Sequence, residues 1–565
     1  MAARNTPKNP DELAVPLDLL LTSATKPFAS RMMPDATWTR MGVSLAKQPR
    51  PVARRIGSLT KELGAIAAGT SHRGPARADK RFADPAWEQN PLLHRIMQAY
   101  LAGAETAEGL LADSQLDWRD QERMRFVVDN LVEGLAPSNN PLISPLGWKA
   151  MIDTGGLSAV RGIKAFARDM LSKPRVPAMV EPDAYVVGET LAVTKGAVVL
   201  RTPVFELIQY APQTAKVREI PLLMVPPVIN KYYIMDIAPG RSMIEYFVQQ
   251  GQQVFVISWR NPQKRHRDWG FDAYGAAIIE AMDAAQKITG ADSTHLLATC
   301  SGGILAAMTA AHLAEIGEGD RVAGLNLSVT VLDEHRAGFA AAAMSDRAAQ
   351  AAIGLSGRRG YLDGRDMAEM FAWLRPTDLV WRYWVNNYVQ GRKPAAFDVL
   401  FWNADTTRMT AALHRDMVLM AVRNALVTPG GVSMLGTPVD LGKVTADAYV
   451  VGGVADHISP WQATYRSARL LGSKDNRYVL STSGHIAALV NPPGNPKASF
   501  HTGPVDTDDP QEWLESSHKS SDSWWPDYVE WLAERSGPEI DAPKALGGEG
   551  LPPLGPAPGG YVMEK

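Results

Sequence analysis

The chain has 565 residues, of which 45% are hydrophobic and 21% are charged, and its formal net charge at pH 7 is -2. This length exceeds what one hydrophobic core usually supports, so it predicts two domains or one domain with a large insertion. The nearly neutral charge argues against a bulk electrostatic attraction to nucleic acid. The single cysteine excludes an internal disulfide and fits a reducing compartment.

The first part of the chain, residues 1–80, mixes apolar patches with basic stretches that proline and glycine interrupt. Its start shows no signal-peptide pattern, and no later run reaches the roughly 18 apolar residues of a membrane span, so we expect a cytoplasmic protein. The basic stretches at 47–55 and 71–81 favour a mobile, loosely ordered segment, and attraction to a surface is the alternative. Residues 81–190 predict a helical N-terminal domain, because apolar residues recur there at three- and four-residue spacing.

Strands and helices alternate in residues 191–332. Short apolar or β-branched runs between turn residues indicate strands. The predicted strands are Ala197–Leu200, Phe205–Tyr210, Pro221–Val225, Val254–Ser258, Thr294–Ala298 and Gly324–Val331. Helices are predicted at Ser242–Gln250, at Asp272–Thr289 and after residue 300. This alternation implies crossover connections, and therefore an α/β core with a parallel sheet covered on both faces.

The alternation stops at residues 333–441, which are rich in Trp, Tyr, Met and Arg and show few strand signals. The simplest interpretation is a cap subdomain inserted over the C-terminal edge of the sheet. Strand patterns resume in residues 442–536, at Ala448–Gly452 and Arg477–Ser481, which form the second part of the core. Residues 537–565 are a Pro/Gly-rich C-terminal tail that we expect to pack weakly.

Cys300 lies where an apolar strand ends and an alanine-rich helix begins. A nucleophile elbow has this position, and it needs small residues two places to either side of the nucleophile. Gly302 meets this requirement fully, and Ala298 meets it only in part. A thiol at a helix N-terminus is also favoured as the thiolate, which is the form that attacks. Simple packing is the alternative, because a lone cysteine in an apolar segment is usually structural.

A catalytic thiol needs a base, and the base needs a partner that orients it. In an α/β-hydrolase sheet the acid and the histidine follow the nucleophile, on loops after later strands. Asp456 and His485 each come just after one of the two strands predicted in the second part of the core. Asp456 could instead cap the next helix, and His457 is an alternative base. The joint order of three loops and three residue types predicts a triad of Cys300, Asp456 and His485.

An oxyanion hole needs two amides aimed at the charge that develops on the acyl oxygen. The amide of Ser301, the residue after the nucleophile, would supply one. The loop after the strand Pro221–Val225 would supply the other, from Val228 or Ile229. We expect no metal ion and no cofactor at this site.

Together these residues resemble the poly(3-hydroxyalkanoate) synthases, which polymerise (R)-3-hydroxyacyl-CoA. The resemblance runs from about residue 82 to the end of the chain and is carried by short motifs along it. The motifs are Asp84-Pro-Ala-Trp, Asn139-Asn-Pro-Leu, Pro226-Pro-Val-Ile-Asn-Lys-Tyr-Tyr-Ile-Met-Asp, Ser258-Trp-Arg-Asn-Pro, Ala298-Thr-Cys-Ser-Gly-Gly, Trp384-Val-Asn-Asn-Tyr, Phe401-Trp-Asn-Ala-Asp-Thr-Thr, Asp456-His-Ile-Ser-Pro-Trp and Gly484-His-Ile-Ala.

The resemblance implies an α/β-hydrolase fold with an inserted cap subdomain and a mainly helical N-terminal domain. It implies that Cys300 carries the acyl chain and that Asp456 and His485 assist it. In this family the aspartate has also been assigned as the base for the 3-hydroxyl group, so the role of Asp456 stays open. The chain departs from the usual glycine at Ala298, where an extra methyl could shift the strand–helix packing.

The length resembles the family types that act without a separate required subunit and form homodimers. We therefore expect an acyltransferase that releases CoA, with (R)-3-hydroxyacyl-CoA, a growing polyester chain and a granule surface as its partners. We expect it in the cytoplasm, on polyhydroxyalkanoate granules, with no nucleic acid bound. A cysteine hydrolase of esters or thioesters on the same fold is one alternative, and a granule-associated protein without catalysis is the other. The preferred acyl length stays open.

Overall fold

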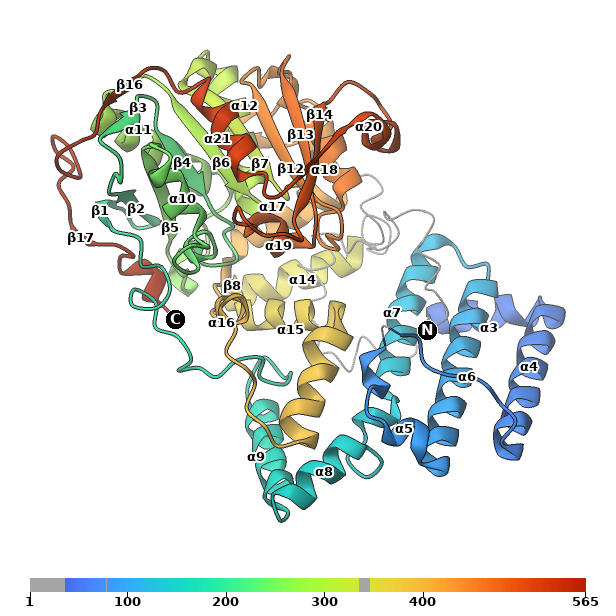
Figure 1. Ribbon diagram of the computed structural model, residues 1–565. Coiled ribbons are helices and arrows are strands. Elements are labelled where there is room, and N and C mark those ends of the chain that lie inside the picture. The colour runs from blue at the N-terminus through green and yellow to red at the C-terminus, as the bar shows by residue number, and fades with distance from the viewer. Residues whose placement is uncertain (1–35, 78, 335–345) are drawn as a thin grey trace. The chain divides into compact units, whose positions relative to one another are not determined.

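The computed structural model describes residues 36–77, 79–334 and 346–565 (Figure 1). These residues form two compact units. The first holds the described residues up to Glu181 together with Arg365–Ala396, and the second holds Pro182–Gly364 and Phe397–Lys565, apart from the undescribed segment. The stretch predicted as one cap subdomain, 333–441, therefore contributes residues to both units. No helix in the described ranges has both the length and the apolar character needed to cross a bilayer.

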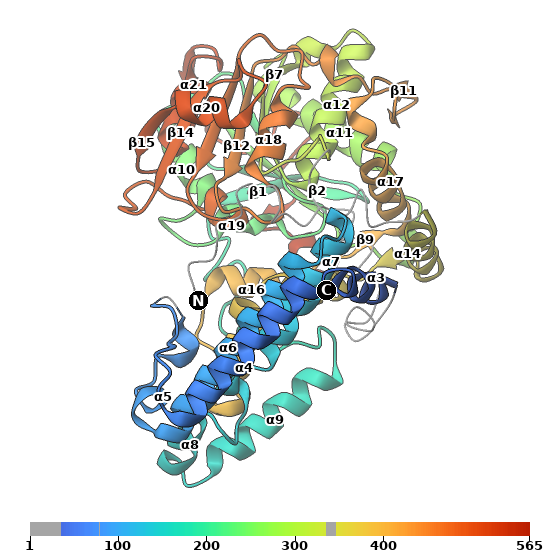
Figure 2. The same cartoon turned by 90° about the vertical axis from the view of Figure 1, so that its right-hand side faces the viewer.

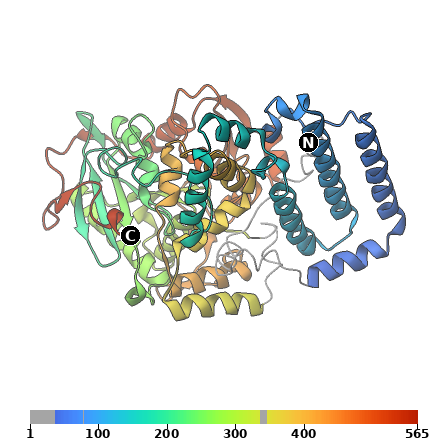
Figure 3. The same ribbon diagram turned by 90° about the horizontal axis from the view of Figure 1, so that it is seen from below.

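The first unit is helical, as predicted. Its main helices are α3 (Ala36–Ala46), α4 (Pro49–Ala68), α5 (Ala86–Gln89), α6 (Pro91–Asp113), α7 (Trp118–Gly134), α8 (Pro145–Asp153), α9 (Leu157–Leu171) and α15 (Gly364–Leu374, whose first residue falls in the second unit). In Figure 3 the blue helices of this unit lie side by side. Helix α6 packs against both α4 and α7.

The prediction of a loosely ordered segment at residues 1–80 is wrong for its described part, and residues 1–35 lie outside the described residues. Residues 36–68 form α3 and α4, and α4 begins with a proline and ends at Gly69 in the left-handed conformation. The basic side chains that suggested disorder have distant acidic partners. Arg55 pairs with Asp113 of α6 at 2.8 Å, and Arg81 pairs with Glu133 of α7 at 3.0 Å.

The aromatic part of the predicted cap packs on α9. Residues 377–381 and 384–389 form short π-helical turns. The rings of Trp384 and Tyr388 each meet Phe166 of α9 edge to face, with centroids 5.8 and 5.4 Å apart. A Cβ on Gly162 would lie 2.1 Å from the carbonyl oxygen of Tyr388, so only glycine permits this approach. Aromatic residues that the sequence analysis assigned to the cap thus pack against α9 of the helical unit.

The second unit is built on one sheet of eleven strands, in the order β15-β14-β13-β12-β7-β6-β4-β5-β2-β1-β17. These strands are β1 (Gly196–Arg201), β2 (Phe205–Tyr210), β4 (Leu222–Val225), β5 (Val254–Trp259), β6 (Thr294–Thr299), β7 (Val322–Ser328), β12 (Ala448–Gly453), β13 (Asn476–Ser481), β14 (Ser499–Pro504), β15 (His518–Ser521) and β17 (Gly555–Pro556). All neighbouring pairs from β5 to β13 are parallel, and the pairs outside them are antiparallel. The predicted parallel sheet is confirmed.

Helices cover both faces of this sheet (Figures 1 and 2). The helices of the second unit are α10 (Met243–Gln249), α11 (Phe271–Thr289), α12 (Ser301–Glu315), α14 (Asp346–Arg359), α16 (Asp398–Ala404), α17 (Ala411–Val422), α18 (Trp461–Ala468), α19 (His485–Leu489), α20 (Pro510–Ser516) and α21 (Trp525–Ala533). Strands β4, β5 and β6 are buried along their whole length, as expected of strands covered on both faces. The core continues into an aromatic cluster in which Phe247 of α10 meets Tyr528 of α21, with centroids 5.7 Å apart.

The expectation that residues 537–565 pack weakly is wrong. Strand β16 (Glu539–Asp541) pairs with β3 (Lys216–Arg218), and β17 extends the main sheet beside β1. Tyr561 and Val562 are buried. Short backbone ladders hold this segment, because hydrogen bonds between main-chain groups need no apolar side chains.

Candidate active site

The turn between β6 and α12 places Cys300 at the carboxyl end of the sheet. Cys300 is half-buried, and its backbone has φ 51° and ψ -122°, a conformation that side chains other than glycine rarely adopt. Its amide donates a hydrogen bond to the carbonyl of Ser328 at 3.0 Å. A strained residue between a buried strand and a buried helix is the geometry of a nucleophile elbow.

Small neighbours make this turn possible. A Cβ on Gly302 would lie 2.4 Å from the carbonyl oxygen of Pro226, and one on Gly303 would lie 2.0 Å from the Thr330 hydroxyl. Ala298 is fully buried and sits in register with Val225 of β4 and Leu327 of β7. The sheet therefore accommodates the extra methyl at position 298, and the turn still forms.

The structure brings Asp456 and His485 together beside this turn. Asp456 follows β12, and His485 is the first residue of α19, just after β13. Nδ1 of His485 lies 2.7 Å from Oδ2 of Asp456. The other carboxylate oxygen accepts hydrogen bonds from the amides of Ile458 and Ser459, at 2.8 and 2.9 Å. Both oxygens of the Asp456 carboxylate are engaged, and its side chain is fully buried.

His485 also interacts with Cys300, and this interaction affects the pKa of the ring. Burial of the ring opposes its charged form, but the Asp456 carboxylate and Cys300 outweigh burial and raise the pKa of His485 to about 10. The raised pKa favours the imidazolium, which is the form that results when the ring accepts a proton from the thiol. The order thiol, imidazole, carboxylate is the arrangement that activates a nucleophile. The alternative base, His457, is not the histidine bonded to Asp456.

The loop after β4 reaches the same turn. Pro226 and Pro227 have no amide hydrogen, so Val228 carries the first free amide after the strand. That amide donates a hydrogen bond to the Ser301 hydroxyl at 3.2 Å. Ile229 is buried one residue further along the chain. No motif in the sequence predicts that the Ser301 side chain contacts this loop.

A small cavity lies beside the thiol. Its volume is about 20 Å³, and its lining residues are Cys300, Ser301, Ile304, Val329, Val331, Glu334, Ile458 and Ser459. A space of this size holds about one water molecule. An acyl group attached to the thiol therefore requires neighbouring side chains to move.

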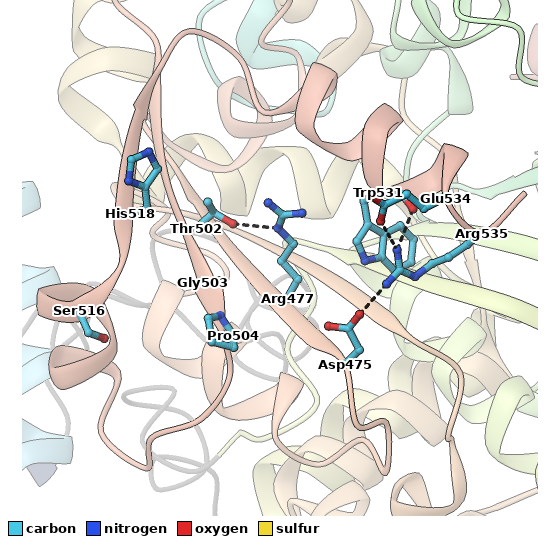
Figure 4. Close-up of a pocket in the computed structure, with 10 residues that line it drawn as sticks. All are labelled: Asp475, Arg477, Thr502, Gly503, Pro504, Ser516, His518, Trp531, Glu534 and Arg535. Atoms are coloured by element: carbon cyan, nitrogen blue, oxygen red, sulfur yellow. Dashed lines mark hydrogen bonds and ion pairs between the residues drawn. The ribbon is translucent and has the colours of Figure 1, made fainter.

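A larger cavity, of about 570 Å³, lies near the amino end of β13 (Figure 4). It is lined by Asp475, Arg477, Thr502, Gly503, Pro504, Ser516, His518, Trp531, Glu534 and Arg535. Asp475 and Arg477 lie at the start of β13, whereas His485 follows its end. Arg477 pairs with Asp527 at 2.7 Å, and Arg535 pairs with Asp475 at 2.5 Å. Its arginines are thus already neutralised, and we assign it no part in the chemistry at Cys300.

Comparison with known proteins identifies the family of this chain. Residues 78–247 match the family model described as the poly-beta-hydroxybutyrate polymerase (PhaC) N-terminus, and residues 234–492 match the model described as the alpha/beta hydrolase fold. Poly(3-hydroxyalkanoate) polymerase 2 of Ectopseudomonas oleovorans is 43% identical over 520 residues, which cover 92% of this chain and 92% of that protein. The poly(3-hydroxyalkanoate) polymerase subunit PhaC of Cupriavidus necator is 37% identical over 509 residues, covering 89% and 86% respectively. The chain, with its helical first unit and its α/β-hydrolase second unit, belongs to the poly(3-hydroxyalkanoate) polymerase family.

Proposed function

We propose that this protein is an acyltransferase that polymerises (R)-3-hydroxyacyl-CoA into polyester and releases CoA, with the chain carried as a thioester on Cys300. The observation that carries the proposal is the Cys300–His485–Asp456 arrangement at the elbow of a chain from this family. A cysteine suits this chemistry. Transfer of an acyl group from CoA to a thiol exchanges one thioester for another, so the acyl group stays activated.

In the first step, the thiol of Cys300 gives its proton to His485, and the sulfur attacks the thioester carbonyl. The C–S bond to CoA breaks, and the leaving CoA thiolate takes the proton back from the imidazolium. The products are free CoA and an acyl thioester on Cys300. His485 ends this step neutral and ready for the next one.

In the second step, the 3-hydroxyl group of another hydroxyacyl-CoA attacks the thioester on Cys300. Its proton passes to His485, an ester bond forms, and the Cys300 sulfur leaves as a thiolate. The lengthened chain, now a CoA thioester, returns to Cys300 by the first step. Asp456 is proposed to orient His485, since its carboxylate is fully buried and already accepts hydrogen bonds from His485, Ile458 and Ser459.

Each step places negative charge on the acyl oxygen. We propose that the amides of Ser301 and Val228 stabilise this charge. Position supports the choice of Val228 over Ile229, because the Val228 amide already contacts residue 301. That amide would exchange its present acceptor, the Ser301 hydroxyl, for the oxyanion.

A granule surface is the proposed partner of the first unit, because the product is a water-insoluble polyester. Helix α9 buries Ser158, Gly162 and Asp169 and turns its apolar residues outward, which is the reverse of an ordinary surface helix. Exposed apolar side chains gather on and around α8 and α9, namely Leu142, Trp148, Ile152, Leu157, Val160, Ile163, Phe166 and Leu171. Exposed apolar side chains that lie together mark an interaction surface. A cytoplasmic, granule-associated homodimer is proposed on the family resemblance.

The decisive experiment incubates the purified protein with (R)-3-hydroxyacyl-CoA substrates of increasing acyl length and follows CoA release and polymer together. We expect CoA release that matches polymer formed, and its loss in Cys300→Ala. Steady release of free hydroxy acid without polymer would support the hydrolase instead. A cellular effect on granules that survives Cys300→Ala, with no CoA release from the unsubstituted protein, would support a role without catalysis.

A further inference from the structure

Lys231 is a buried charged residue that the proposed chemistry does not use. Its side chain is 3% exposed and lies in the loop after β4. Burial of an ammonium group is unfavourable unless partners compensate for the lost water. Burial lowers the pKa of Lys231, and Asp405 opposes that shift. A side chain needed only to fill this space could be apolar, so the ammonium group calls for a different explanation.

The partners of Lys231 come from two distant parts of the second unit. Its Nζ lies 2.9 Å from Oδ1 of Asp405 and donates a hydrogen bond to the carbonyl of Val562 at 2.6 Å. The carbonyl of Lys231 itself accepts a hydrogen bond from Nε1 of Trp402 at 2.7 Å. Asp405 is held in turn by the hydroxyl of Tyr233, at 3.1 Å. Lys231 thus joins the loop to residues 402–405 and to residue 562.

The other end of the loop touches the nucleophile turn. Nε1 of Trp259 donates to the carbonyl of Pro226 at 2.9 Å, and the Val228 amide donates to the Ser301 hydroxyl. Two consecutive prolines leave this end few conformations. The Val228 amide therefore lies between two anchored residues, Pro226 and Lys231.

The carbonyl that Lys231 binds is itself fixed. Tyr561 makes two hydrogen bonds. Its amide donates to the Glu206 carboxylate at 2.9 Å, and its side-chain hydroxyl donates to the carbonyl of Thr202 at 2.6 Å. The guanidinium of Arg260 lies over the Tyr561 ring, 4.3 Å from its centroid, and pairs with Glu564 at 3.1 Å. Residues 561–564 are thus held against β2 and the end of β5, next to Lys231.

We propose that Lys231 is a positioning residue, which uses Asp405 and the carbonyl of Val562 to hold the Val228 amide where the oxyanion forms. The proposal rests on the proposed function, because it assigns Lys231 a task within that reaction. Lys231 touches neither the substrate nor the sulfur. It acts through the loop.

Two reactions of the same sulfur separate positioning from a merely structural role. Acylation of Cys300, by a p-nitrophenyl ester or by (R)-3-hydroxybutyryl-CoA, forms an oxyanion and needs the hole. Alkylation of Cys300 by iodoacetamide displaces iodide at a saturated carbon and forms no oxyanion. Alkylation still needs a folded, activated thiol. A displaced loop slows the first reaction and spares the second.

The variants are Lys231→Met, the double variant Lys231→Met/Asp405→Asn, and a chain lacking residues 562–565. The double variant leaves no unpaired buried carboxylate, so it keeps the test valid if the single variant does not fold. Lys443→Met is the matched control, because Lys443 is an exposed lysine paired with Glu315 at the far end of α12 from Cys300.

We expect acylation to fall about 10- to 100-fold in the double variant and in the shortened chain, with alkylation within about twofold of the unsubstituted protein. Lys443→Met should change neither rate. Equal loss of both reactions, or loss of neither, would overturn the proposal. Failure of the proposed function looks different: the unsubstituted protein would itself release no CoA and form no acyl-enzyme with the ester.

Discussion

At the scale of the residue, the backbone of Cys300 is strained. A residue other than glycine in such a backbone conformation destabilises the fold by about 1–3 kcal/mol, and contacts in the surrounding structure must offset that energy. The hydrogen bond from the Cys300 amide to Ser328 and the burial of β6 and α12 hold the turn in place. The strained turn keeps the sulfur clear of the neighbouring backbone.

Cys300→Gly should therefore stabilise the fold while it abolishes CoA release. Glycine relieves the strain, and part of this gain is lost to the greater freedom of glycine in the unfolded chain, which leaves about 1 kcal/mol. Calorimetric unfolding measures the change. Cys300→Ala, which keeps the Cβ and the strain, is the control and should not stabilise. A Cys300→Gly variant no more stable than Cys300→Ala would contradict this account of the turn.

The pKa of His485 predicts a pH dependence of stability. Its folded value, about 10, lies above the ordinary value of 6.5. Because the fold favours the imidazolium form of His485, this group contributes its full stabilisation below pH 6.5. The contribution is lost as the pH rises toward 10 and the ring loses its proton. The difference in unfolding midpoint between the unsubstituted protein and His485→Gln should thus narrow from pH 6.5 to pH 10, as scanning calorimetry can measure. A constant or widening difference would show that His485 is not stabilised as an imidazolium.

At the scale of the element, the packing of α12 against the loop after β4 depends on Gly302. Alanine is more favourable than glycine in a helix by about 1 kcal/mol. At position 302, however, the added Cβ would lie 2.4 Å from one backbone oxygen and 2.6 Å from another. Backbone oxygens at the end of a central strand cannot swing aside. We therefore expect the steric clash to outweigh the gain in helix propensity.

Gly302→Ala is accordingly expected to lower the free energy of unfolding by about 1–3 kcal/mol and to reduce CoA release. Gly354→Ala in α14 is the matched control, because nothing lies within 4 Å of the added Cβ there. That variant should be neutral or slightly stabilising in denaturant unfolding. If both variants behave alike, strand–helix contact at the elbow is not what requires Gly302.

Much of the second unit follows from local sequence pattern. Alternating strand and helix periods predict the parallel sheet, and the order of Cys300, Asp456 and His485 along the chain predicts that they meet at its carboxyl edge. The contact of the Val228 amide with the Ser301 hydroxyl cannot be predicted from sequence, because it depends on how closely the loop approaches α12. Local signals fix where loops begin, and packing fixes how near they come.

The wrong predictions share a physical cause. Arg55 in α4 reads as a solvated charge, but its partner Asp113 is a residue of another helix. Strands β16 and β17 are two or three residues long and find their partners, β3 and β1, more than 300 residues earlier in the chain. Within the predicted cap, Trp384 and Tyr388 likewise have a neighbour that is distant in sequence, Phe166 of α9. In each case the stabilising partner is distant in sequence.

At the scale of the whole molecule, the two units suit different tasks. The second unit holds the chemistry in a tightly packed sheet, and the first exposes apolar side chains on α8 and α9. A polymerase whose product is insoluble works at the border between water and an apolar phase. A separate helical unit that contacts that phase would leave the packing around Cys300 unchanged.

The pair Ile152→Glu and Ile163→Glu tests this division. Both side chains are exposed, 74% and 69%, so charge there should leave folding and CoA release from soluble substrate within about twofold. Binding to washed polyester particles should fall about tenfold or more, as co-sedimentation measures, because charge would face an apolar surface. Exposed Ile316→Glu, on the second unit, is the control and should bind normally. Unchanged binding of the double variant would exclude α8 and α9 as the contact.

The order of the strands has a consequence for biosynthesis. The thiol sits at the end of β6, whereas the carboxylate and the imidazole follow β12 and β13, which come more than 140 residues later. A ribosome that has exposed only the strands up to β7 therefore displays a sulfur with no proton acceptor beside it. Translation itself delays the first acyl transfer, because the sulfur has no proton acceptor until the chain as far as His485 has left the ribosome.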